Sequence, residues 1–125
     1  MANKIAFVFP GQGAQYVGMG KDFYEKFPAS REIFEKADAF LQRPFSALIF
    51  EGALEELTQT KNSQLAIFIV SLAIHAALRK SLPEIVPSVC AGLSLGEYTA
   101  LVASGKLSLE EGLALVEKRA MFMQH

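Results

Sequence analysis

The sequence has 125 residues, 51% of them apolar, and 12 basic against 13 acidic side chains give a net charge of −1. This length allows one domain, and the balanced charge excludes the basic surface typical of proteins that bind nucleic acid or anionic membranes. The single cysteine, Cys90, excludes an internal disulfide and is expected to be a small buried apolar residue. No secretory signal is evident, because the apolar run before Pro10 is only five residues long, residues 5–9. We therefore expect a cytoplasmic protein.

The chain opens with an apolar segment, residues 4–9, which predicts a buried strand of the parallel type because its polarity does not alternate. A glycine-rich loop follows at residues 10–20. It lacks the lysine of a P-loop and the G-x-G-x-x-G pattern of dinucleotide-binding proteins, so neither phosphate-binding site is expected. The loop would place Gln12 and Gln15 at the carboxyl end of the strand, where open α/β sheets bind ligands. The alternative is a flexible connector with solvated glutamines.

The next segments are expected to be helical. Ser30 is predicted to cap a helix that ends near Leu41, because apolar residues recur there at helical spacing. Two short helical turns are expected at residues 44–50 and 53–57. The polar residues 58–63 predict a loop with a helix cap.

Residues 64–82 form the most apolar segment and predict a core helix. Its apolar stretch includes Ser71 and His75, and we expect it to be too short and too polar to span a bilayer. Gln64 at its start is a candidate site residue. His75 is better explained as a helix residue with a local partner than as a catalytic base.

Residues 92–96, Gly-Leu-Ser-Leu-Gly, match the G-x-S-x-G pattern of a nucleophile elbow. Strand-like residues 85–91 precede it, and a helix is predicted over 95–104 with Gly105 as its C′ residue. A serine at such a corner has a strained backbone, and the flanking glycines let strand and helix pass closely. Ser94 would then lie beside free N–H groups that stabilise the oxyanion of an acyl intermediate. A Gly/Ser turn that merely ends a strand is the alternative.

The last helix is predicted to begin at Ser108, which can form a capping box with Glu111, and to reach the chain end. Arg119 interrupts its pattern, because it lies on the flank of an otherwise apolar face. A cation in that position either extends to solvent or is reserved for an anion in a pocket. The pattern alone favours neither.

The segment after the first strand, the serine motif and Arg119 together resemble a known family. Residues 7–13 (Phe-Val-Phe-Pro-Gly-Gln-Gly), residues 92–98 (Gly-Leu-Ser-Leu-Gly-Glu-Tyr) and Arg119 resemble the malonyl-CoA:acyl-carrier-protein transacylases of fatty acid and polyketide synthesis. The resemblance implies an α/β fold, namely the N-terminal portion of an α/β-hydrolase-like acyltransferase core with parallel strands and a nucleophile elbow. Because family members are much longer, residues 1–125 are expected to be the N-terminal part of the acyltransferase domain. The small ferredoxin-like subdomain and the catalytic-histidine region would be absent.

The resemblance also implies a role for individual residues. Ser94 would be the acylated nucleophile, with Gln12 and the backbone N–H of Leu95 holding the oxyanion. Arg119 would bind the malonyl carboxylate, and Gln64 would lie near the bound acyl group. The implied reaction is ping-pong: malonyl-CoA acylates the serine, CoA leaves, and the phosphopantetheine thiol of acyl carrier protein takes the malonyl group. No metal and no bound cofactor is expected, because the thioester is already activated.

The sequence departs from the family in two places. Leu93 stands where the family usually has a histidine, and neither His75 nor His125 matches the histidine that activates the serine. A nucleophile without its base is weak, so the chain alone is expected to be inactive. An esterase, lipase or thioesterase of the α/β-hydrolase type would use the same elbow with water as acceptor. A truncated, non-catalytic assembly module is the other alternative.

Overall fold

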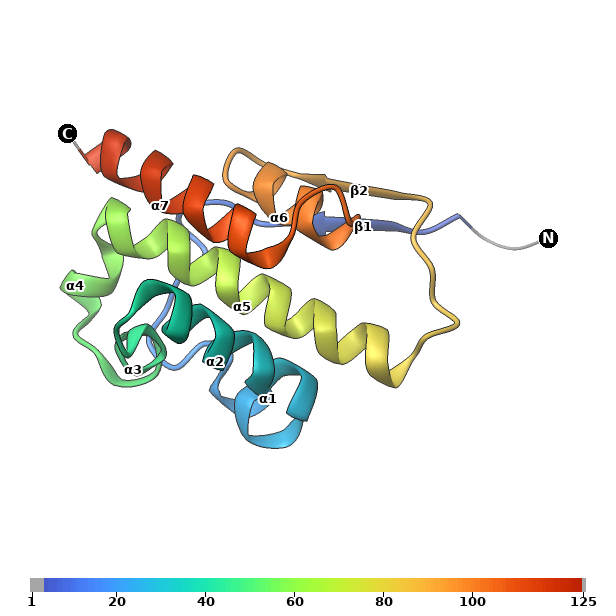
Figure 1. Ribbon diagram of the computed structural model, residues 1–125, viewed down its shortest axis with the longest axis horizontal. Coiled ribbons are helices and arrows are strands. Elements are labelled where there is room, and N and C mark those ends of the chain that lie inside the picture. Colours follow the sequence, from blue (N-terminus) through green and yellow to red (C-terminus); the bar gives the residue numbers. More distant parts are fainter. Residues whose placement is uncertain (1–3, 125) are drawn as a thin grey trace.

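The computed structural model describes residues 4–124, so His125 lies outside the described part of the chain (Figure 1). Within these residues the chain forms two strands and seven helices. In chain order they are β1 (Ala6–Phe9), α1 (Lys21–Lys26), α2 (Pro28–Leu41), α3 (Phe45–Glu51), α4 (Leu54–Thr58), α5 (Thr60–Ser81), β2 (Val89–Gly92), α6 (Gly96–Ala103) and α7 (Leu109–Gln124).

The two strands pair in parallel, with Ala6 opposite Val89 and Phe9 opposite Gly92. Five helices lie between them in the chain, because parallel neighbours require a crossover connection. The predicted α/β class with parallel strands is therefore confirmed. The prediction of fully buried strands is wrong: the side chains alternate, and Val8 is 74% exposed whereas Phe7 is half-buried. Phe7 and Phe9 face His75 of α5, and α6 packs against both strands, whereas the alternate side chains of the strands stay exposed.

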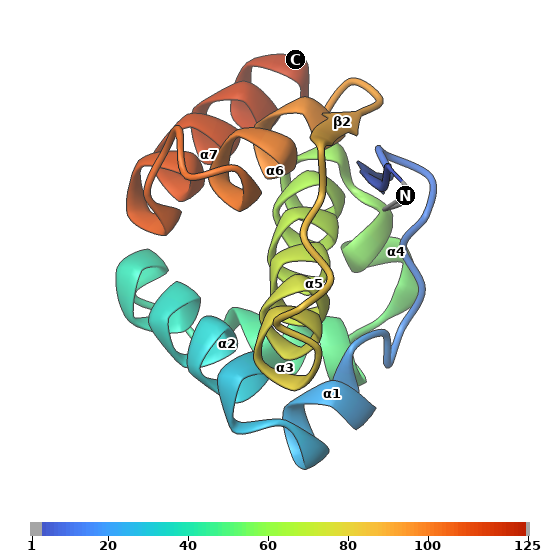
Figure 2. The ribbon, with the colours of Figure 1, turned by 90° about the vertical axis from the view of Figure 1, so that its right-hand side faces the viewer.

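Helix α5 is the axis of the structure, with α2 along one side and α7 along the other (Figures 1 and 2). It begins at Thr60, and Gln59 alone separates it from α4, so the predicted polar loop over 58–63 is wrong. The polar residues there serve packing between helices. Asn62, for example, is buried and donates from Nδ2 to the carbonyl oxygen of Glu56 at 2.8 Å.

By length and composition alone α5 could cross a membrane, since it has 22 residues and an 18-residue window of mean hydropathy 1.3. The expectation that this segment is too short was therefore wrong. Its surroundings are those of a helix packed within a protein, because 67% of that window is buried inside the structure. This is the arrangement of a core helix, as the sequence predicted.

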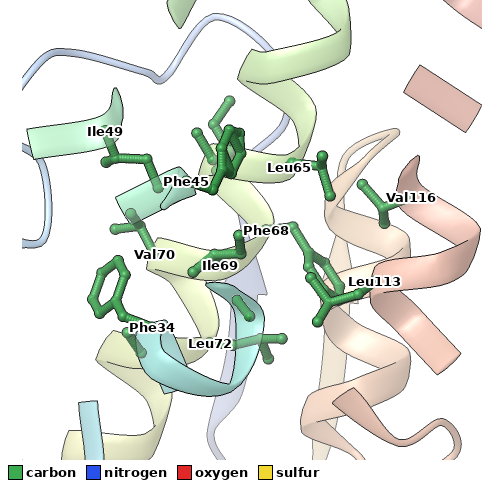
Figure 3. Packing of buried hydrophobic residues seen from close by; sticks show 14 of the residues in the cluster. Phe34, Phe45, Ile49, Leu65, Phe68, Ile69, Val70, Leu72, Leu113 and Val116 are labelled. Atoms are coloured by element: carbon green, nitrogen blue, oxygen red, sulfur yellow. The ribbon is translucent and has the colours of Figure 1, made fainter. Parts of the chain in front are cut away.

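The hydrophobic core lies on both sides of α5 (Figure 3). Phe34 of α2 and Phe45 and Ile49 of α3 contact one side, while Leu113 and Val116 of α7 contact the other. All five side chains are 2% exposed or less. Because burial of each contributes roughly 1.5–3 kcal/mol, this packing holds α5 between α2 and α3 on one side and α7 on the other.

Ser30 does not cap α2, contrary to the prediction. The helix begins at Pro28, after Phe27 in an extended conformation, because proline suits the first helical position. Ser30 is instead buried within the first turn, where its hydroxyl donates to the carbonyl oxygen of Ala73 at 2.6 Å. The contact joins α2 to α5, and α2 ends at Leu41 as predicted.

The two last helices follow their predicted signals. Helix α6 ends at Ala103, and Gly105 beyond it has a φ of 83°. Ahead of α7, the hydroxyl of Ser108 accepts from the N–H of Glu111, and the Glu111 carboxylate accepts from the N–H of Ser108, both at 3.0 Å. These bonds hold the pKa of Glu111 below its ordinary value, and the bond from the backbone N–H of Ser108 has the largest effect. The predicted capping box thus fixes the start of the helix that carries Arg119.

Candidate active site

Strand β2 leads directly into Ser94, and α6 begins two residues later at Gly96. Ser94 has a φ of 54°, in the left-handed region that residues with a Cβ rarely adopt. Strain of this kind persists only where the surrounding structure enforces it. The predicted strand, strained serine and helix are therefore confirmed, and the Ser94 side chain is exposed at the corner.

The elbow holds this shape because its glycines leave no room for a side chain. A Cβ on Gly92 would lie 2.0 Å from the carbonyl carbon of Gly96. One on Gly96 would lie 2.2 Å from the carbonyl oxygen of Phe9, the last residue of β1. A Cβ on Gly11, in the loop after β1, would clash with the carbonyl oxygen of Leu93 at 2.6 Å. Both strands and the loop after β1 are therefore pressed against the serine corner.

The guanidinium of Arg119 reaches the elbow from α7. Its Nη2 donates to Oγ of Ser94 at 2.8 Å, and its Nη1 donates to Oε1 of Gln64 at 2.6 Å. It also lies 5.5 Å from the centroid of the Tyr98 ring, a cation–π contact. Among the described residues no carboxylate lies within 4 Å of it. The structure thus favours a cation held in a site over one extended to solvent.

Gln64 is fully buried near the start of α5. Its Oε1 accepts from Arg119, and its Nε2 donates to the sulfur of Met123 at 3.3 Å. Both ends of the amide therefore have partners, as a buried amide requires. The site consequently joins α5, α6 and α7 through side chains.

The two glutamines of the glycine-rich loop differ. Gln12 donates from Nε2 to Oγ1 of Thr60, the first residue of α5, at 3.2 Å. Gln15 accepts from the N–H of Gly13 at 2.8 Å and so closes the loop on itself. Gln15 thus has a structural role in the loop, and its place beside a ligand stays a prediction. Gln12 lies in the segment that packs against the elbow, and its part in an oxyanion site stays a prediction.

The backbone at Leu95 is also near this loop. A Cβ on Gly11 would lie 3.9 Å from the Leu95 nitrogen. Within residues 4–124, the Leu95 N–H donates to no carbonyl outside the regular helix and strand bonds. This N–H lies at the entrance to α6, where helix N–H groups favour an anion.

His75 and Cys90 belong to the strand side of the structure. His75 packs edge-on against Phe7 and Phe9, with ring centroids 5.7 and 6.1 Å apart. Burial, and then the nearby Arg79, lower its pKa from the ordinary value. This matches the expected helix residue with a local partner, and no hydrogen bond between described residues joins it to Ser94. Cys90 is half-buried on β2, so the prediction of full burial is wrong.

Three contact residues of the site were not identified from the sequence: Thr60, Tyr98 and Met123. Thr60 lies four positions before Gln64, and Met123 lies four positions after Arg119. Residues four apart share one face of a helix, so this spacing was the available signal. Tyr98 is the last residue of the 92–98 motif, and the motif alone assigns no contact to its ring.

A parallel strand that turns through a strained serine into a helix defines the α/β-hydrolase-like class of nucleophile-elbow proteins. A further feature of this site is the hydrogen bond from the Arg119 guanidinium to the Ser94 hydroxyl. The chain belongs to the acyl transferase domain family, which matches residues 6–125. This confirms the family and fold class expected from the sequence.

Individual relatives agree with this assignment. The chain is 50% identical over 121 residues to the malonyl CoA-acyl carrier protein transacylase of Bacillus subtilis (strain 168), covering 97% of this chain and 38% of the relative. The solved structure of the malonyl CoA-acyl carrier protein transacylase from Coxiella burnetii matches with a TM-score of 0.93 and 42% identity, covering 100% of this chain and 39% of that one.

A third match is the complex PlMCAT:AntF, a type II PKS acyl-carrier protein with its malonyl-transacylase. Its TM-score is 0.91 at 38% identity, and the match covers 98% of this chain and 39% of that one. The chain thus spans about two fifths of the length of the relatives it matches.

Proposed function

We propose that this chain supplies the nucleophile and the acyl-binding residues of a malonyltransferase. The reaction moves a malonyl group from malonyl-CoA to the phosphopantetheine thiol of acyl carrier protein through a malonyl-Ser94 intermediate. One observation carries the proposal: the Arg119 guanidinium, which has no carboxylate partner among the described residues, hydrogen-bonds the nucleophile at 2.8 Å. An acyl group that ends in a carboxylate complements this arrangement. The names of the relatives support the same assignment.

The dimensions of a malonyl group fit the contact. One methylene separates its two carboxyl carbons, which lie about 2.5 Å apart. When Oγ of Ser94 bonds the thioester carbon, the free carboxylate is therefore only a few ångströms away, within reach of the guanidinium. Arg119 can exchange its bond to Ser94 for a two-pronged bond to the carboxylate while Gln64 continues to hold Nη1.

The chemistry has two symmetrical steps. Oγ of Ser94 attacks the malonyl thioester carbon, the C–S bond breaks, and CoA leaves as its thiol with the proton taken from the serine. The carrier-protein thiol then attacks the malonyl ester, and the serine hydroxyl is restored. In both steps the backbone N–H of Leu95 and the amide of Gln12 would stabilise the negative oxygen. Gln12 would exchange its bond to Thr60 for this one. The activated thioester makes a metal or bound cofactor unnecessary.

Both steps need a base for the Ser94 proton. Arg119 is unsuitable, because a guanidinium donates hydrogen bonds and accepts none. Within the described residues no histidine hydrogen-bonds the serine. We therefore propose that residues 1–125 form the first part of the acyltransferase domain and that the base comes from outside them. The chain alone would then transfer no malonyl group. A reducing compartment such as the cytoplasm suits the free Cys90 thiol.

The test is acylation of the complete protein with malonyl-CoA. One malonyl group is expected, mapped by peptide mass spectrometry to Ser94, and it should move to carrier protein when that is added. Ser94→Ala should prevent the adduct, whereas Ser88→Ala, at an exposed serine before β2, should leave it unchanged. A label on Cys90, or release of malonate to water in place of transfer, would contradict the proposal.

A further inference from the structure

We propose that Met123 is a positioning residue, whose thioether fixes the amide of Gln64 in the one orientation that holds Arg119. The kinetic part of this inference rests on the proposed malonyl transfer. The structural part does not, because it concerns only contacts within the protein.

Two hydrogen bonds of the Gln64 side chain connect α5 to α7. Nε2 of the buried Gln64 amide donates to the Met123 sulfur at 3.3 Å, while Oε1 accepts from Nη1 of Arg119 at 2.6 Å. Met123 and Arg119 lie four positions apart, on one face of α7, so the helix itself holds the two partners of the amide side by side.

The chemistry of these partners allows one amide orientation. A guanidinium only donates hydrogen bonds, and a thioether only accepts them. Rotating the Gln64 amide by half a turn would set its NH₂ group against the guanidinium, and its oxygen against the sulfur. Both hydrogen bonds would be lost, and the buried Gln64 amide would be left without partners, which is destabilising although Met123 itself is 51% exposed. Without an acceptor at residue 123, the NH₂ end would have no such preference.

Orientation matters for Arg119 because its other hydrogen bond is temporary. The contact to Ser94 must be released when the serine attacks and the acyl carboxylate binds. The Gln64 bond then remains to aim the guanidinium, together with the ring of Tyr98. Loosening Gln64 should therefore lower the transfer rate of acyl groups that carry a carboxylate. Transfer of other acyl groups should be unaffected.

The test replaces Met123 by leucine, which has nearly the same volume and no acceptor. In the complete protein, Met123→Leu should lower kcat/KM for malonyl transfer by about fivefold, the range of one hydrogen bond. Acetyl transfer should stay within experimental error. Met121→Leu is the matched control, since Met121 is exposed on the same helix and makes no contact with Gln64 that the structure records.

A double variant tests whether Met123 acts through Arg119. In the Arg119→Ala background, Met123→Leu should cause no further loss, because the group that it positions is gone. An equal fall in malonyl and acetyl transfer, or an undiminished effect without Arg119, would overturn the proposal. So would an equal effect of Met121→Leu.

A second readout needs no activity. With methyl-labelled methionine, NMR should show a nuclear Overhauser effect between the Gln64 NH₂ protons and the methyl group of Met123. Its absence in the unmodified protein would overturn the inference. If the effect is present and the protein transfers no malonyl group, the proposed function fails and the positioning of Gln64 stands.

Discussion

Gly96 at the start of α6 lies directly against Phe9 at the end of β1. A Cβ on Gly96 would come within 2.2 Å of the Phe9 carbonyl oxygen. The same oxygen accepts a hydrogen bond from the N–H of Leu93 at 3.3 Å. Because the obstructing atom belongs to the backbone, it cannot rotate aside. The position of Ser94 therefore depends on the hydrogen atom that glycine has in place of a side chain.

The first prediction concerns this contact. Gly96→Ala should lower the free energy of unfolding of the complete protein by about 3 kcal/mol or more, at the upper end for overpacking, because backbone must move. Denaturant unfolding followed by circular dichroism measures it. Gly105→Asn is the control: a Cβ there meets nothing within 4 Å, and asparagine tolerates its φ of 83°. Equal losses in both variants would contradict the steric explanation.

The second prediction concerns pH and His75. Its pKa is lowered in the folded protein by burial and by Arg79, so the unfolded chain binds the proton more readily. Stability from this residue is therefore fully present above the unfolded pKa of about 6.5. It is lost as the pH falls from there through the lower folded pKa.

His75→Phe keeps an aromatic ring against Phe7 and Phe9 and removes the titration. Thermal unfolding of the complete protein between pH 8 and about pH 5 should show a smaller loss of Tm on acidification in this variant. Other groups titrate in both proteins, so the difference between the two profiles reports His75. Parallel profiles would show that its folded pKa is not lowered.

Much of the fold followed from local sequence signals. The capping box at Ser108, the C′ glycine at Gly105 and the elbow around Ser94 each involve residues a few positions apart. Their conformations are set by hydrogen bonds and steric limits within one turn. For that reason the sequence alone predicted them correctly.

Other features depend on packing between distant segments. Ser30 resembles a cap, yet it is buried against Ala73, 43 positions away. The polar start of α5 resembles a loop, yet Asn62 bonds to the carbonyl oxygen of Glu56. Polar residues are ambiguous in a sequence, because the same side chain can cap a helix, solvate a loop or join two helices.

The candidate site shows the same division. The elbow pattern identified Ser94, and the helical wheel showed that Arg119 was unusual. Neither could show that the two side chains meet, because 25 positions separate them, nor that Met123 lies on Gln64, 59 positions earlier. Such pairs arise only when α5, α6 and α7 pack together.

The third prediction tests the start of α7. Ser108→Ala removes the acceptor for the N–H of Glu111 and should lower stability by about 1 kcal/mol, as for other N-cap serines. Ser108→Asp retains an acceptor beside the positive end of the helix and should restore most of it. Denaturant midpoints of the complete protein measure both. If the two variants lose the same stability, the cap does not depend on the side-chain acceptor.

The fourth prediction concerns acyl selectivity at Arg119. Removing one partner of a sheltered ion pair costs roughly 3–5 kcal/mol, because the other charge is left unpaired. At about 1.4 kcal/mol per tenfold, Arg119→Ala should lower kcat/KM for malonyl transfer by about a hundredfold or more. Acetyl groups have no carboxylate, so acetyl transfer should fall little or even rise, because the cation that faces the methyl group is removed.

The measurement is the ratio of malonyl to acetyl transfer in the complete protein and in the variant. Arg119→Lys should restore part of the ratio, since lysine keeps the charge but lacks the fork that binds Gln64 and a carboxylate together. Lys118→Ala is the control: its side chain is exposed on the same helix, and the ratio should not change. If Arg119→Ala lowers both transfers by the same factor, the guanidinium supports the elbow through Ser94 and does not select the acyl group.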